Sequence, residues 1–175
     1  ASTVLCIRLL VVVWIAAREH WATFAVPIAI LTATGAACVL LARMGVRGES
    51  APLPPPENPT QLKSALLFAG LFAMVLFASA AGREYFGEGG TYVVAFLSGL
   101  TDMDAISLSL GGHVTEGSLD AVTGARGVVL AFVANTMFKT VMAGSLGGFA
   151  LARRLAPLMA LQVVVGVVLV FWKVG

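Results

Sequence analysis

Charged side chains are scarce in this sequence. Asp, Glu, Lys and Arg together make up 11% of its 175 residues, whereas soluble globular domains carry about 25%. Hydrophobic residues make up 59%, and the mean hydropathy is +0.95. A water-soluble domain of this size exposes too much surface to hide so many apolar side chains. The composition therefore predicts an all-α integral membrane protein.

Several functional signals are also missing. The net charge is only +2 and there is no dense run of Lys or Arg, which argues against nucleic-acid binding. Cys6 and Cys38 lie in apolar segments without Cys-x-x-Cys or Cys/His spacing, so we expect small core residues. No nucleophile triad, phosphate loop or zinc motif is present, and we do not expect an enzyme. The chain has no basic n-region, so we do not expect a cleavable signal peptide. Because it begins with Ala1 rather than Met, we expect a fragment of a longer polypeptide.

Long apolar stretches alternate with short polar loops. A membrane-spanning helix needs about 20 apolar residues. By this measure we predict one domain, residues 1–175, folded as a six-transmembrane-helix bundle. Ser118 or Asp120 is placed to cap the fifth span. The spans are predicted at residues 3–17, 22–44, 60–82, 91–111, 121–148 and 155–173.

The fourth predicted span contains two acidic residues, Asp102 and Asp104. Carboxylates at that depth usually face a bundle interior, pair with a cation or mark an ion path. In a continuous helix they would lie about 200° apart, so one would face its own bundle and the other a second subunit. Alternatively the helix is broken: Ser98-Gly99 weakens its middle and Thr101-x-x-Asp104 has the form of a capping box. A restart at Thr101 would place free N–H groups beside both carboxylates.

Basic and amide groups occur in two other spans. Arg8 lies in the first, and Asn135 and Lys139, four residues apart in the fifth, share a helix face. Two acids and two bases sum to zero charge, as a dehydrated polar core requires. Two interpretations stay open: an ion or proton path, or a structural lock that only fixes the helix arrangement. Lys139 is also long enough to extend to the membrane interface.

From these residues we predict that the chain transports or conducts a small cation or a proton. Arg8 and Lys139 are the predicted internal counter-charges. Oxygen-only ligation favours a hard cation such as Na⁺, K⁺, Mg²⁺ or Ca²⁺. The alternative is a non-transporting interaction or regulatory module of the membrane. The expected partners are the lipid bilayer and a second copy of the chain, and the expected metal ligands are Asp102, Asp104 and Asn135. The predicted ion-binding or pathway residues are Asp102, Asp104, Thr101, Ser98, Ser107 and Asn135.

Two motifs resemble those of a known family. They are GLTDMDAISLSL, which begins at Gly99, and ANTMFK, which ends at Lys139. They are similar to motifs of a bacterial membrane family, domain of unknown function 4010, whose members often follow an MgtC/SapB-type membrane domain. The resemblance covers essentially the whole chain, including the arginine in the first span. It implies a multi-pass protein of the bacterial inner membrane and an MgtC/SapB-type domain as partner, but no particular transported species.

Overall fold

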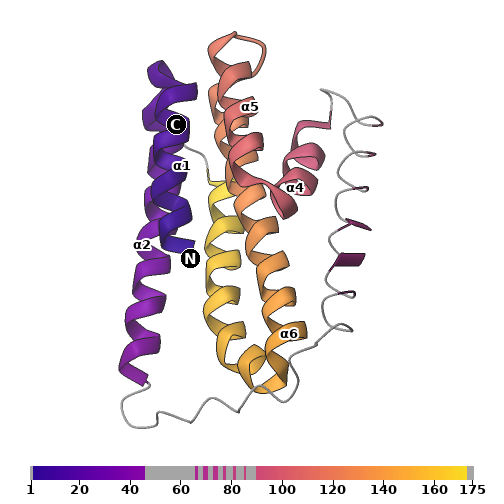
Figure 1. Ribbon diagram of the computed structural model, residues 1–175. Coiled ribbons are helices and arrows are strands. Elements are labelled where there is room, and N and C mark those ends of the chain that lie inside the picture. The colour runs from indigo at the N-terminus through magenta and orange to yellow at the C-terminus, as the bar shows by residue number, and fades with distance from the viewer. Residues whose placement is uncertain are drawn as a thin grey trace.

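The computed structural model describes residues 2–45 and 90–172, together with isolated positions between residues 66 and 85. Over these residues the protein is helical and has no strand (Figure 1). The third predicted span, residues 60–82, lies outside the described residues except for such isolated positions. The elements are α1 (Ser2–Ala16), a short 3-10 turn η1 (Arg18–His20), α2 (Trp21–Gly45), α4 (Thr91–Thr101), α5 (Met103–Thr115) and α6 (Ala121–Phe171).

The helices α1 and α2 form an antiparallel hairpin, joined by η1 (Figure 1). Two threonine hydroxyls of α2 are satisfied within their own helix. Thr32 and Thr34 each donate a hydroxyl hydrogen bond to the carbonyl four residues earlier, at 2.7 and 2.8 Å. Such bonds let hydroxyls occupy a helix in an apolar environment without a partner from another element. Cys38 is buried, as expected, whereas the side chain of Cys6 lies outside the described residues.

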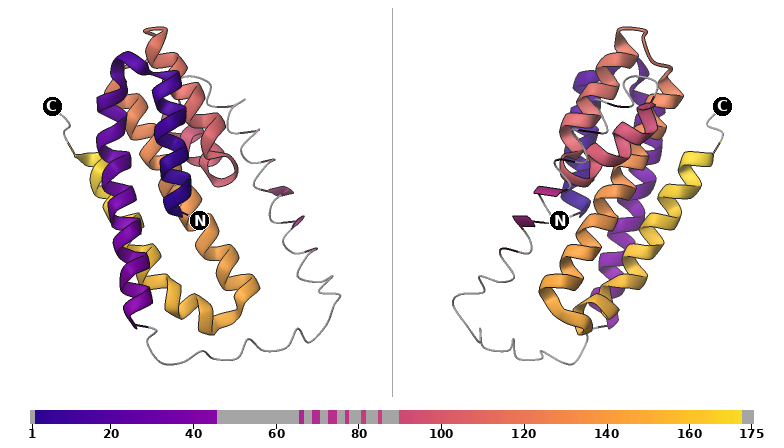
Figure 2. Two further views of the ribbon diagram at one scale, coloured as in Figure 1. Left: turned by 60° about the vertical axis from the view of Figure 1, so that its left-hand side comes forward. Right: turned by 90° about the vertical axis from the view of Figure 1, so that its right-hand side faces the viewer.

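The long helix α6 folds back on itself (Figure 2). A Cβ atom at Gly166 would lie 2.5 Å from Val133 Cγ2, and Arg126 Nη2 lies 3.4 Å from the carbonyl oxygen of Trp172. We call residues 121–145 the first limb and residues 155–171 the second limb. They correspond to the fifth and sixth predicted spans. The carboxylate of Asp120 caps the start of α6, accepting from two backbone N–H groups at 3.0 and 3.1 Å.

The helices α4 and α5 run in opposite directions along the first limb. Ala95, midway along α4, and Leu110 of α5 both lie against Gly127, while Gly99, nearer the end of α4, lies against Ala131. α4 therefore follows α6 inward to the level of Ala131, and α5 returns to the end from which α4 came (Figures 1 and 2). Together they form a V of two short helices.

The α1–α2 turn and the loop between α5 and α6 lie at one end of the bundle, which we call the loop end (Figure 1). Thr115 Oγ1 donates to the carbonyl oxygen of Ala16 at 2.7 Å and ties the two turns together. The ends of the V that face away from its break lie at the loop end as well.

Two helical segments among the described residues are long and apolar enough to cross a membrane, Arg18–Leu41 and Ala121–Ser145. Shorter apolar helices are Ile7–Ala16, Thr91–Thr101 and Leu155–Phe171. The six-span bundle is not confirmed. The predicted fourth span differs most, because residues 91–111 form a V instead of one helix.

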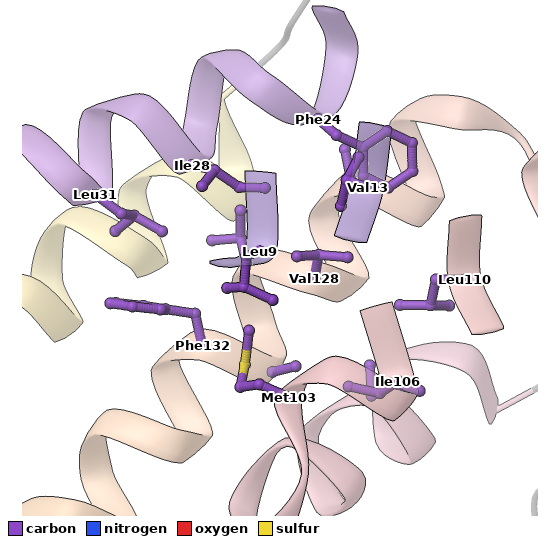
Figure 3. Packing of buried hydrophobic residues seen from close by; sticks show 14 of the residues in the cluster. Leu9, Val13, Phe24, Ile28, Leu31, Met103, Ile106, Leu110, Val128 and Phe132 are labelled. Atoms are coloured by element: carbon purple, nitrogen blue, oxygen red, sulfur yellow. The ribbon is translucent and has the colours of Figure 1, made fainter. Parts of the chain in front are cut away.

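The core lies where α1, α2, the V and α6 meet (Figure 3). Met103, the first residue of α5, is 2% exposed and packs there with Leu9 and Phe132. The start of α5 is therefore fixed by apolar packing as well as by its cap. Figure 3 labels Leu9, Val13, Phe24, Ile28, Leu31, Met103, Ile106, Leu110, Val128 and Phe132.

Candidate functional site

The backbone of Asp102 interrupts the fourth predicted span. α4 ends at Thr101, Asp102 has an extended conformation (φ −139°, ψ 101°), and α5 begins at Met103. Asp102 Oδ1 accepts hydrogen bonds from the backbone N–H groups of Asp104 and Ala105, both at 3.0 Å. These bonds satisfy two of the free donors at the start of α5, so Asp102 is its N-cap.

The same residue closes the end of α4. The backbone N–H of Asp102 donates to the carbonyl oxygen of Ser98 at 2.8 Å, and Thr101 Oγ1 donates to that oxygen at 3.2 Å. The broken helix, one of the two alternatives that the sequence left open, is therefore the one observed. The predicted restart at Thr101 is wrong by one or two residues, since the cap is Asp102. Aspartate is a stronger N-cap than threonine, which explains the choice.

Asn135 of α6 holds the broken end of α4. Its side chain is buried, and Nδ2 donates to the carbonyl oxygen of Gly99 at 3.0 Å. The last carbonyls of a helix have no partner within the helix, so a side-chain donor from a neighbour takes that role. The approach needs glycine: a Cβ atom at Gly99 would lie 2.5 Å from the backbone Cα and O atoms of Ala131.

We expect Asn135→Leu to lower the free energy of unfolding by about 1–3 kcal/mol, because it leaves a buried carbonyl without a donor. Thermal unfolding of the purified protein in detergent measures this. The matched control is Gln162→Leu, since Gln162 is also buried in α6 but its Nε2 has no hydrogen-bond partner among the described residues. Equal losses in the two variants would contradict the capping role of Asn135.

Arg8 of α1 pairs with Asp104 of α5. Arg8 Nε donates to Asp104 Oδ1 at 3.2 Å, and Arg8 Nη2 contacts Asp104 Oδ2, so two nitrogens face two oxygens. The side chains are 60% and 31% exposed, so the pair lies on the outside of the described bundle. Arg8 therefore does meet one of the two aspartates, but on the exposed side of the described bundle and not in the dehydrated polar core that the sequence predicted.

Arg8, Asp102, Asp104 and Asn135 form what we call the polar cluster. Asn135 lies near the middle of the apolar segment Ala121–Ser145, so the cluster sits midway along the bundle rather than at a loop. It gathers groups of four kinds around one helix break: carboxylates, a guanidinium, a side-chain amide and the carbonyl end of α4.

The remaining predicted residues lie close to the cluster in the fold. Ser98 and Ser107 are 5% and 0% exposed, and their hydroxyl oxygens have no hydrogen-bond partner within the described part of the chain. Lys139 is half-buried and follows Asn135 by one turn of α6. Its role as internal counter-charge stays a prediction, as does ion binding by the two serines.

The proposed metal ligands do not form a dense cluster of acidic, His or Cys side chains. Among the residues that the structure describes, no group of three or more such side chains could hold a metal ion. The Nδ2 atom of Asn135 already donates a hydrogen bond to the carbonyl oxygen of Gly99. A cation at this place would depend on backbone carbonyls and hydroxyls as well as carboxylates, which are the ligands of hard cations.

The sequence reasoning missed two features near this site. One is the contact of Gly99 with Ala131, since Gly99 was interpreted only as a helix-weakening residue. The other is Arg126, which lies between α4 and both limbs of α6. The sequence signal that could have identified Arg126 was its position near the start of the fifth predicted span.

A family profile described as "Domain of unknown function (DUF4010)" matches residues 1–147. The chain belongs to this family. A protein of Aquifex aeolicus (strain VF5), described as an uncharacterised protein, is 34% identical over 84 residues. That match covers 48% of this chain and 36% of the relative, so the chain spans little more than a third of the length of the curated relative. No solved structure matches the chain.

Membership of the DUF4010 family confirms the resemblance that the two motifs indicated. The matched residues include the whole polar cluster, from Arg8 to Asn135, and also Lys139. The second limb of α6 lies beyond the match. The break, its cap and its ion pair are therefore part of the DUF4010 domain itself.

Proposed function

We propose that this domain conducts or transports a small cation or a proton across the bacterial inner membrane, as a multi-pass protein, with the polar cluster as its ion site. The observation that carries the proposal is the helix break at Asp102, midway along an apolar bundle. Non-helical backbone at membrane depth is tolerated where it is buried in protein or lines a water-filled cavity. Interrupted helices of this kind form the ion sites of many secondary transporters.

The charges around the break favour a cation over an anion. The positive end of α5, which would otherwise attract an anion, is already occupied by the carboxylate of Asp102. Arg8 offsets one of the two carboxylates, so these three side chains together leave one negative charge. The end of α4 adds carbonyl oxygens, which carry partial negative charge. A monovalent cation or a proton would neutralise these three side chains, in competition with Lys139, the second predicted counter-charge.

The ion pair suggests how binding would be coupled to movement. A cation that binds at Asp104 competes with Arg8 for the same oxygens. Arg8 belongs to α1 and Asp104 to α5, so release of the pair would remove the ionic contact between the V and α1 and leave their apolar packing and the Thr115–Ala16 hydrogen bond. A ligand shifts a conformational equilibrium only by its differential affinity for the two states, and this competition supplies such a difference.

Asp102 provides the first test, because its cap and its charge can be separated. Asn caps a helix about as well as Asp, whereas Ala does not. We expect Asp102→Asn to keep the stability of the wild type but to lose most cation flux. Asp102→Ala should lose flux and also about 1 kcal/mol of stability. Flux into vesicles reconstituted with the purified protein, under Na⁺, K⁺, Mg²⁺, Ca²⁺ and pH gradients, measures this.

A structural lock is the second candidate. Arg8 ties α1 to α5 and Asn135 ties α6 to α4, so the polar groups also join elements far apart in sequence. Under this candidate the domain is a non-transporting interaction or regulatory module. Absence of wild-type flux under all five gradients, with a well-folded protein in the vesicles, would favour the lock. So would unchanged flux in Asp102→Asn.

A homodimer is part of the proposal. Arg8 and Asp102 are exposed on the described bundle at mid-depth. Charged groups at that depth face protein or water rather than lipid. A second copy placed against this face would supply the protein. The mass of the solubilised protein, measured by light scattering, tests for the dimer.

A further inference from the structure

An open groove of about 350 Å³ lies between α4 and both limbs of α6, at the loop end. Apart from one arginine, its walls are apolar and aromatic. It is separate from the polar cluster, which lies deeper along the same helices. The groove is lined by Tyr92, Arg126, Leu130, Val167, Val170 and Phe171.

Among the described side chains that line this groove, Arg126 alone is charged. Its Nη2 atom donates to the backbone carbonyl of Trp172 at 3.4 Å, which is a long contact. Its Nε atom is buried without a partner within the described residues. None of the carboxylates in the described ranges lies within ion-pair distance of it. A guanidinium in apolar surroundings is costly unless an anion pairs with it.

The groove is polar at its outer end and apolar further in. Arg126 lies near the start of the first limb, and Leu130 lies one turn deeper. Because the limbs are antiparallel, Phe171 lies at the level of Arg126 and Val167 one turn deeper. Tyr92 lines the groove, and Trp172, which follows the lining residue Phe171 in the sequence, is 60% exposed. Tyr and Trp gather at the level of lipid headgroups in membrane proteins.

We propose that this groove binds an anionic phospholipid, with its phosphate on Arg126 and an acyl chain along Leu130 and Val167. Arginine pairs with phosphate through two parallel N–H bonds, and the Nε–H group of Arg126 has no partner within the described residues. The apolar wall below it fits a hydrocarbon chain and gives a free phosphate nothing to contact. The inference rests on the membrane location in the proposed function, but not on cation passage.

Trp172 provides a local probe. In a Trp14→Phe/Trp21→Phe background it is the remaining tryptophan. The protein is reconstituted into vesicles that contain brominated phosphatidylglycerol or brominated phosphatidylcholine, and quenching of Trp172 is measured against mole fraction. We expect the anionic lipid to reach half-quenching at about fivefold lower mole fraction, the preference expected from one basic residue near the surface.

Variants of Arg126 decide the assignment. Arg126→Gln should reduce the preference to about one, and Arg126→Lys should keep part of it, because Lys retains the charge but not the planar fork. The control is Arg18→Gln, which removes a basic residue at the same end and should leave the preference unchanged. Equal quenching by both lipids, an unchanged preference in Arg126→Gln, or displacement by inorganic phosphate overturns the proposal.

The assay does not measure flux, so the two proposals fail separately. Loss of the lipid preference in a protein that still conducts cations overturns only the lipid site. A protein without flux that keeps the preference leaves the lipid site standing and contradicts only cation passage.

Discussion

Asp104→Asn is expected to lower cation flux by roughly tenfold to a hundredfold, the loss that corresponds to a bond made by a charged group. The substitution keeps the size of the side chain but removes the charge that would attract the cation. It also releases Arg8, whose positive charge then stands beside the site without its partner. The initial rate of uptake into reconstituted vesicles, at several cation concentrations, measures the effect. The matched control is Glu116→Gln, which removes a carboxylate from the exposed loop between α5 and α6.

Arg8→Gln separates transport from a structural lock. If Arg8 competes with the cation for Asp104, removing Arg8 should lower the cation concentration that gives half-maximal flux. If the pair is only a lock, Arg8→Gln and Asp104→Asn should destabilise the fold similarly and leave any flux alone. The pair lies on the outside of the described bundle, and exposed ion pairs in water contribute only about 0–1 kcal/mol. An unchanged half-maximal concentration in Arg8→Gln would contradict the exchange mechanism.

Much of the local structure could be predicted from the residues. Asp120, one of the two residues predicted as the cap, caps α6, and the apolar runs near residues 22–44 and 121–148 form long helices. Asp102 was predicted as an ion-site residue because an acidic residue in an apolar run has few energetically acceptable places, whereas the helix cap was expected at Thr101. A helix end is one of these places, since the carboxylate there accepts backbone N–H bonds that would otherwise have no partner.

The direction of α5 could not be predicted in the same way. One long helix and a V of two short helices are both compatible with the apolar pattern of residues 91–111. Hydrophobic periodicity indicates which face of a helix is buried, but not the direction of the helix that follows. The V depends on contacts between distant segments: Gly99 against Ala131, and Asn135 with the carbonyl of Gly99. Pairing of Arg8 with Asp104 rather than Asp102 was equally open, since it follows from where α1 meets α5.

The contact between Gly99 and Ala131 holds the break in place. Gly99 should therefore be the position in the V that tolerates substitution least. We expect Gly99→Ala to lower the free energy of unfolding by about 3 kcal/mol or more, as overpacking adds to the loss of a buried hydrogen bond. The new methyl group would lie 2.5 Å from two backbone atoms of Ala131, which cannot turn away as a side chain would. α4 must then move off α6, and the carbonyl of Gly99 leaves Asn135. Thermal unfolding in detergent measures the loss.

Two further variants test whether the loss of stability comes from the backbone contact at Gly99. Gly112→Ala places the same methyl group in α5, where nothing lies within 4 Å, so it should be neutral or stabilise by up to about 1 kcal/mol through helix propensity. Ala131→Gly in the Gly99→Ala background removes a facing methyl group but leaves the backbone in place, so it should not restore stability. Full rescue by Ala131→Gly would mean that side chains alone set the distance between α4 and α6. The hydrogen bond from Asn135 to the carbonyl of Gly99 would then not depend on contact between the two backbones. That result would contradict the expectation that backbone contact fixes the geometry of the break.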